Sequence, residues 1–113
     1  MRLKISTEFS KFPGPRYPRE GEHSGEEFRK TVLFPAFEKA AAAKEPLVVD
    51  LDGTCGFGTS FLEEAFGGLI RENQIPLSEF RNTIRLISLD EPSLLDEIEQ
   101  DILEAEEERC KNV

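Results

Sequence analysis

The block from Leu47 to Ile70 constrains the fold of this 113-residue chain more than any other segment. A short apolar run ends in Asp50-Leu51-Asp52, passes through a loop with three glycines, and enters an amphipathic segment at Ser60. A buried strand that leads through a glycine-rich turn into a helix is typical of α/β proteins. Such proteins often place their functional groups at that turn, where helix N–H groups are free. The block therefore predicts an α/β fold with candidate functional residues in or just after the loop.

The rest of the chain supplies the other elements of that fold. Residues 2–6 and 82–89 alternate between apolar and polar side chains, which predicts two strands beside a central strand at 47–51. Helices are predicted at 24–44, 60–72 and 93–108. The order β-α-β-α-β-α predicts one domain over residues 1–113, with a small mixed, mainly parallel sheet flanked by helices.

Local signals mark the ends and irregularities of the first two helices. Ser24 and Glu27 fit a capping box, and Ser60 and Glu63 repeat the same spacing. Pro35 predicts a kink in the first helix, because proline has no N–H to donate. The pair Gly67-Gly68 costs about 1 kcal/mol per residue relative to alanine in a helix, which indicates a close approach by another part of the protein or by a partner.

The chain is acidic, with a formal net charge of −9 and ten acidic residues between Asp90 and Glu108. Nucleic-acid binding needs clustered lysine and arginine, so we expect no nucleic-acid partner. The acidic helix could attract a basic protein or could be a solvated surface, and the sequence leaves both open. The two cysteines and single histidine form no ligand-like cluster, so we expect no metal and no cofactor.

The location of the protein is inferred from its N-terminus and hydropathy. No apolar run is long enough to span a bilayer, so we expect no membrane partner. The segment MRLKISTEF has no apolar signal core. These features predict a cytoplasmic protein in which Cys55 and Cys110 are reduced thiols.

The string Asp50-Leu51-Asp52-Gly53-Thr54 resembles the nucleophile motif of haloacid-dehalogenase-type phosphatases. That resemblance implies a Mg²⁺-dependent phosphohydrolase in which Asp50 attacks the phosphoryl group and Asp52 acts as acid and base. However, the only lysine after the motif is Lys111, and few residues remain for the rest of such an enzyme. The sequence favours turn-stabilising roles for both aspartates, and it keeps the phosphohydrolase as an alternative.

A nucleotide-binding sensor is the second alternative. The amides of the glycine-rich loop could hold a phosphate group. No lysine precedes Thr59 and Ser60 as it would in a nucleotide-hydrolysing P-loop. The sequence therefore allows weak anion binding at this loop but excludes a P-loop enzyme.

The same block also resembles the STAS domain of anti-sigma-factor antagonists, in which a strand ending in Asp-Leu precedes a loop, two hydroxyl residues and a helix. The chain is more specifically similar to the STAS-like family of small uncharacterised bacterial proteins. Three segments carry this resemblance, which covers roughly residues 1 to 105: Gly14–Tyr17, the helix start Ser24–Arg29, and the block Val49–Leu69.

This resemblance implies a non-enzymatic signalling module. We expect the protein to be a monomer or a weak homodimer. Its partner would be a protein. In the related switch proteins this partner is a histidine-kinase-like ATPase, which phosphorylates one hydroxyl of the pair. The corresponding residues here are Thr59 and Ser60. A phosphate at a helix N-terminus adds about two negative charges and would remodel a docking surface. The surface expected to contact the partner comprises Gly56, Phe57, Gly58, Phe61, Glu64, Gly67 and Gly68.

Overall fold

The computed structural model describes residues 1–111. Its sheet contains β1 (Arg2–Lys4), β2 (Leu47–Asp50) and β3 (Ile84–Ile87), in the spatial order β1-β2-β3. Both strand pairs are parallel. The predicted α/β domain is confirmed, and the described sheet is parallel throughout rather than mixed.

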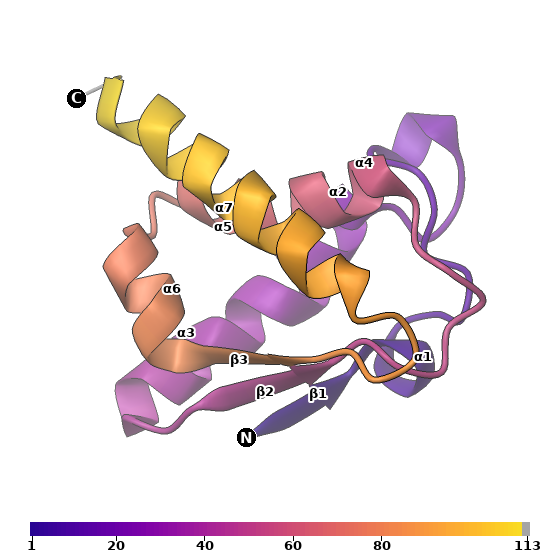
Figure 1. Ribbon diagram of the computed structural model, residues 1–113, viewed down its shortest axis with the longest axis horizontal. Coiled ribbons are helices and arrows are strands. Elements are labelled where there is room, and N and C mark those ends of the chain that lie inside the picture. Colours follow the sequence, from indigo (N-terminus) through magenta and orange to yellow (C-terminus); the bar gives the residue numbers. More distant parts are fainter. Residues whose placement is uncertain (112–113) are drawn as a thin grey trace.

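Helical segments connect and flank these strands (Figure 1). They are α1 (Ile5–Glu8), the 3₁₀ turn η1 (Pro18–Glu20), α2 (Gly25–Phe28), η2 (Arg29–Leu33), α3 (Phe34–Ala43), α4 (Thr59–Leu62), η3 (Glu63–Gly67), α5 (Gly68–Arg71), α6 (Leu77–Thr83) and α7 (Ser93–Lys111). Among residues 1–111, no helix is both long and apolar enough to cross a membrane.

The first two predicted helices are present, but each contains a wide π-helical turn in its middle. Segment η2 ends two residues before Pro35, whose missing N–H prevents a regular hydrogen bond to the preceding turn. Segment η3 is a π-helical turn in the middle of the second helix, and it contains no proline. The first helix ends at Ala43, and Lys44 caps it with φ 57° while the Glu45 N–H donates to the Ala40 carbonyl at 3.0 Å.

Two predicted strands are shorter than expected. The strand predicted at 2–6 ends at Lys4, because the chain turns into α1 at Ile5. The strand predicted at 82–89 covers only Ile84–Ile87. Helix α6, which the alternation pattern missed, occupies the preceding residues and buries Phe80 and Thr83 three residues apart.

The core is formed by the apolar faces that the helical periodicity predicted. Phe28, Phe61 and Phe66 are fully buried and are the largest of these side chains. In α7 the buried stripe includes Ile98 and Ile102 as expected, although it begins at Leu94 instead of Leu95. The predicted first-helix residues Val32 and Ala36 pack against the core while remaining half-buried.

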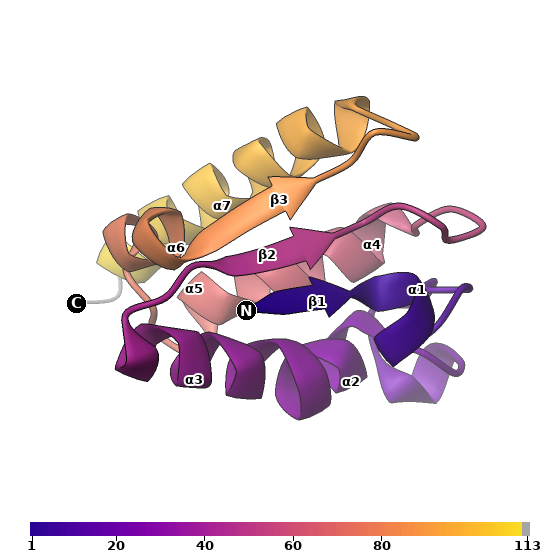
Figure 2. The same ribbon diagram turned by 90° about the horizontal axis from the view of Figure 1, so that it is seen from below.

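The helices are distributed unevenly about the sheet. In Figure 1 most of them lie above the strands, α1 lies level with the strands at the end of β1, and α7 packs on η3 and α5. Figure 2 views the molecule from below, and none of the helices drawn over residues 1–111 crosses in front of the strands. One face of the sheet therefore contributes to the core, and the opposite face is uncovered.

Candidate functional site

The glycine-rich loop between β2 and α4 is held by the N-terminal segment of the chain. The Cys55 N–H donates to the Lys11 carbonyl at 2.7 Å, and the Gly58 N–H donates to the Pro13 carbonyl at 3.1 Å. A Cβ atom at Gly58 would overlap the carbonyl oxygen of Gly14. Glycine is therefore required at this position so that the two backbones can touch.

The two aspartates of the DLDGT string stabilise the turn. Asp50 Oδ1 accepts from the Asp52 N–H at 2.9 Å, and Asp50 Oδ2 pairs with Arg2 at 3.0 Å and Lys4 at 3.6 Å. Burial disfavours the charged form of Asp50, but these partners outweigh it and hold its pKa below the ordinary value. The predicted turn-stabilising role of Asp50 is confirmed, and both of its carboxylate oxygens are engaged.

Asp52 joins the loop after β2 to the loop after β3. Its Oδ1 accepts from the N–H groups of Leu89 at 2.8 Å and Asp90 at 2.9 Å. Asp90 Oδ2 in turn accepts from the Gly53 N–H at 3.1 Å. This reciprocal bonding fixes the two strand ends to each other, and it accounts for the second aspartate of the string.

A polar cleft of about 380 Å³ lies between these two loops. The residues that line it include three acidic ones, Asp52, Asp90 and Glu91. Most of the N–H groups of the loop that could hold a phosphate already donate within the protein, including those of Gly53, Cys55, Gly56 and Gly58. The cleft is therefore acidic, and it does not have the character of a phosphate-binding nest.

The loop–helix junction, defined here as residues 56–60, carries the two predicted hydroxyl residues. Thr59 and Ser60 are exposed at the start of α4. The predicted capping box at Ser60 is wrong, because Gly58 is the N-cap and the helix begins at Thr59. Glu63, which would have completed the box, is instead paired with Arg16 and Arg71.

Only part of the predicted docking surface is accessible. Gly56 is exposed, and Phe57 and Gly58 are half-buried. The other four predicted residues lie in the interior, so they cannot contact a partner directly: Phe61, Glu64, Gly67 and Gly68. Phe61 belongs to the aromatic core, where its ring stacks on Phe28 with a centroid separation of 5.6 Å.

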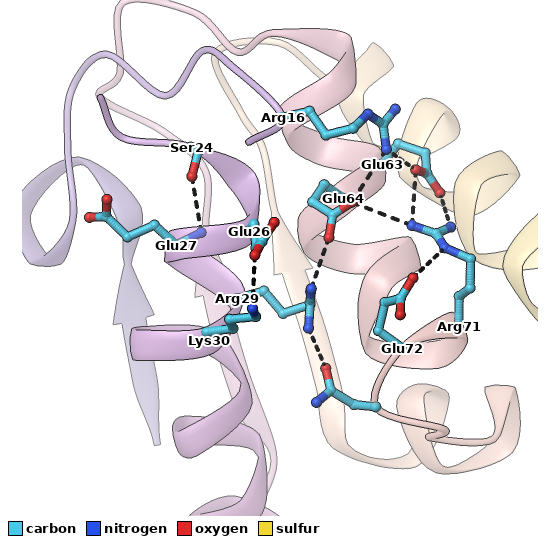
Figure 3. Close-up of polar contacts among 11 residues, drawn as sticks. Arg16, Ser24, Glu26, Glu27, Arg29, Lys30, Glu63, Glu64, Arg71 and Glu72 are labelled. Atoms are coloured by element: carbon cyan, nitrogen blue, oxygen red, sulfur yellow. Dashed lines mark hydrogen bonds and ion pairs between the residues drawn. The ribbon is translucent and has the colours of Figure 1, made fainter. Parts of the chain in front are cut away.

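Glu64 is buried because it forms an ion pair with Arg29, as Figure 3 shows. Glu64 Oε2 accepts from Arg29 at 2.8 Å, and only 4% and 5% of the two side chains are exposed. A second nitrogen of Arg29 donates to Asn73 at 3.0 Å. Buried opposite charges of this kind depend strongly on each other, since the loss of one leaves the other without a partner.

Glu63 extends this pair into a network that reaches the surface (Figure 3). Its carboxylate binds both Arg16 and Arg71, and these arginines also lie 3.5 Å and 3.6 Å from Glu64. Burial raises the pKa of Glu63, but the hydrogen bonds from Arg71 and Arg16 more than offset it, so the pKa lies below the ordinary value. The network connects the N-terminal loop, the α2–η2 helix and the helix that follows the junction.

The two glycines of the second helix make room for the side chains of this network. A Cβ at Gly68 would lie 2.5 Å from Arg29 Nε. A Cβ at Gly67 would lie 2.5 Å from Glu63 Oε2, whereas its distance of 3.5 Å from the Asp101 carbonyl on α7 would be an ordinary contact. The predicted close approach is confirmed, and the approaching groups are side chains of the chain itself. This pair of glycines was the one feature of the sequence that indicated the network. It did not reveal that Arg29 is the residue that approaches Gly68.

Residues 24–94 match the family described as the STAS-like domain of unknown function (DUF4325). The chain belongs to this family. No curated protein and no solved structure matches the chain significantly.

The matched part of this STAS-like domain begins at Ser24, whose side chain caps α2 by accepting from the Glu27 N–H at 3.1 Å. It includes the junction and both residues of the Arg29–Glu64 pair. It excludes β1 and Arg16, so the outer part of the network lies outside the matched segment.

Proposed function

We propose that this STAS-like domain is a non-enzymatic regulatory module that binds a protein partner at the loop–helix junction. Phosphorylation of Thr59 or Ser60 controls this binding, and the partner is a kinase of the histidine-kinase-like ATPase type. The observation that carries the proposal is the presence of two adjacent exposed hydroxyls at the start of a helix.

The surroundings of the hydroxyls support a switch that acts through charge. Three consecutive segments, α4, η3 and α5, continue the helix from Thr59 to Arg71. The positive end of the helix dipole favours a phosphate at Thr59 or Ser60. The buried Arg29–Glu64 pair fixes the body of this helix, so the added charge would change the exposed surface more than the core.

The proposal differs in detail from the pattern of the anti-sigma-factor antagonists. Gly58 stands where that pattern has aspartate, and Phe61 stands where it has glycine. The structure gives both residues other roles, since Gly58 touches Gly14 and Phe61 fills the core. Kinase recognition in this protein must therefore rely on Gly56, Phe57 and neighbouring exposed groups.

The non-enzymatic part of the proposal rests on Asp50. A phosphatase nucleophile needs a free carboxylate oxygen that faces the substrate. Asp50 is 5% exposed, and its two oxygens are held by Asp52, Arg2 and Lys4. This arrangement favours a structural role over nucleophilic attack.

The test is incubation of the full chain with a purified histidine-kinase-like ATPase and Mg-ATP, followed by intact-mass analysis. We expect one added phosphoryl group on the wild-type chain, and its loss in the Thr59→Ala/Ser60→Ala double variant. Ser78→Ala is the matched control, because this serine is exposed near the start of α6, away from the junction. Phosphorylation of the double variant, or unchanged kinase binding by it, would contradict the proposal.

A further inference from the structure

The uncovered face of the sheet has a distinctive composition. The parallel register sets two rows of side chains across this face, and the members of each row come from β1, β2 and β3 in turn. The rows are Arg2, Val48 and Arg85, and then Lys4, Asp50 and Ile87. The alternate residues, such as Leu3 and Val49, face the core and are buried.

An all-parallel sheet is usually covered on both faces, because its connections place helices there. In Figure 2 no helix among residues 1–111 crosses in front of the strands. Val48 and Ile87 alternate with residues that face the core, so they belong to this uncovered face. Both side chains remain half-buried. The sheet therefore has an aliphatic centre without the layer that normally covers it.

The charges around this aliphatic centre are mainly positive. Asp50 forms ion pairs with both Arg2 and Lys4, so one carboxylate is shared by two cations. Arg85 is exposed and donates to the carbonyls of Arg81 at 2.6 Å and Ile84 at 3.1 Å. Within residues 1–111, no carboxylate forms an ion pair with Arg85. The two rows thus carry three cations and one carboxylate, although the net charge of the chain is −9.

We propose that this face binds an acidic amphipathic helix of a partner protein. The apolar stripe of the partner helix packs on Val48 and Ile87, and its flanking carboxylates pair with Arg85 on one side and with Arg2 and Lys4 on the other. A helix fits better than a strand, because the free surface is the face of the sheet and helices are the elements that cover such faces.

Two other occupants fit the face less well. A second copy of this chain would bring together two molecules of net charge −9, and the apolar stripe of its acidic helix α7 is already buried. A single-stranded nucleic acid would need aromatic side chains for stacking, whereas Val48 and Ile87 are aliphatic. Helix α4, which begins with Thr59 and Ser60, lies on the other side of the sheet (Figures 1 and 2), so this proposal does not depend on phosphorylation.

The test uses two synthetic peptides of about 20 residues, a length that supports helix formation. Both carry the same leucine and alanine stripe, which is bordered by glutamate in one peptide and by lysine in the other. Binding of fluorescein-labelled peptide to the full chain is measured by fluorescence anisotropy. We expect the acidic peptide to bind with a Kd below about 1 mM and the basic peptide to bind at least about tenfold more weakly.

Arg85→Glu reverses the one cation of the face that lacks a carboxylate partner, and we expect it to weaken binding of the acidic peptide by about tenfold. Lys111→Glu is the matched control, since it makes the same kind of change at the exposed end of α7 and should leave the affinity unchanged. The proposal is overturned if the acidic peptide fails to bind, if the basic peptide binds equally well, or if Arg85→Glu has no effect while the variant is folded by circular dichroism.

Discussion

Arg29 and Glu64 bring opposite charges into the interior, where each is the closest charged partner of the other. We expect Arg29→Met to lower the free energy of unfolding by about 3 kcal/mol, because it leaves the Glu64 carboxylate buried without its main partner. Arg29→Met combined with Glu64→Leu should cost clearly less than the sum of the single substitutions. Urea denaturation of the two single variants and the double variant measures this coupling.

Lys30→Met is the control for this prediction, because the neighbouring Lys30 pairs with Glu26 on the exposed side of the same helix. Its effect should stay within about 0.5 kcal/mol. If Arg29→Met costs no more than Lys30→Met, the buried pair does not support the fold as argued.

Among the described residues, Asp101 on α7 has the side-chain pKa that lies furthest from its ordinary value. Burial first, and then the charges of Glu63, Glu97 and Glu104, raise its pKa to about 7, while Arg16 acts in the opposite direction. One of its oxygens, Oδ2, is buried and has no hydrogen-bond partner among the described residues. In the folded protein the carboxyl group therefore keeps its proton to a higher pH than an ordinary aspartate does.

At pH values between the ordinary pKa of aspartate, 3.8, and about 7, Asp101 is protonated in the native state and ionised in the unfolded chain. The contribution of Asp101 to stability is therefore present at low pH and is lost as the pH rises through about 7. We expect Asp101→Asn to raise the melting temperature more at pH 8 than at pH 5. An equal change at the two pH values in thermal scans would show that Asp101 does not titrate in this way.

At the scale of elements, the crossing of α2 over α4 depends on a glycine. A Cβ at Gly25 would lie 2.6 Å from the Phe61 carbonyl oxygen and 3.1 Å from its Cα, which are backbone atoms that cannot rotate away. We expect Gly25→Ala to destabilise the fold by about 1–3 kcal/mol, despite the better helix propensity of alanine. Chemical denaturation gives the measurement.

Gly14→Ala provides the comparison, because the nearest atom to its Cβ would be the Phe12 carbonyl oxygen at 4.0 Å. Its effect should be within about 0.5 kcal/mol. Equal destabilisation by the two variants would mean that the helix crossing tolerates the extra carbon.

The elements also show where sequence periodicity succeeds and fails. The amphipathic stripes of the long helices were predictable, because burial of one face repeats over several turns. Helix α6 was missed, since seven residues provide too few turns to distinguish helical from alternating order. The interior position of Glu64 was also missed, because it depends on Arg29, a residue 35 positions earlier in the chain.

At the scale of the whole molecule, the topology was predictable but the covering of the sheet was not. The alternation of strands and helices implies parallel pairing, because each strand must return to the same end of the sheet. Nothing in the pattern Arg2, Lys4, Val48 and Arg85 shows whether a helix of the same chain lies over them. That information requires the three-dimensional placement of every helix.

The strand order β1-β2-β3 has a consequence for synthesis on the ribosome. Each new strand pairs beside the one made immediately before it, and no later strand has to be inserted between two earlier ones. The first strand pair and the helices that connect it can therefore assemble while β3 and α7 are still being translated. Helix α7 emerges after these segments and then packs on η3 and α5.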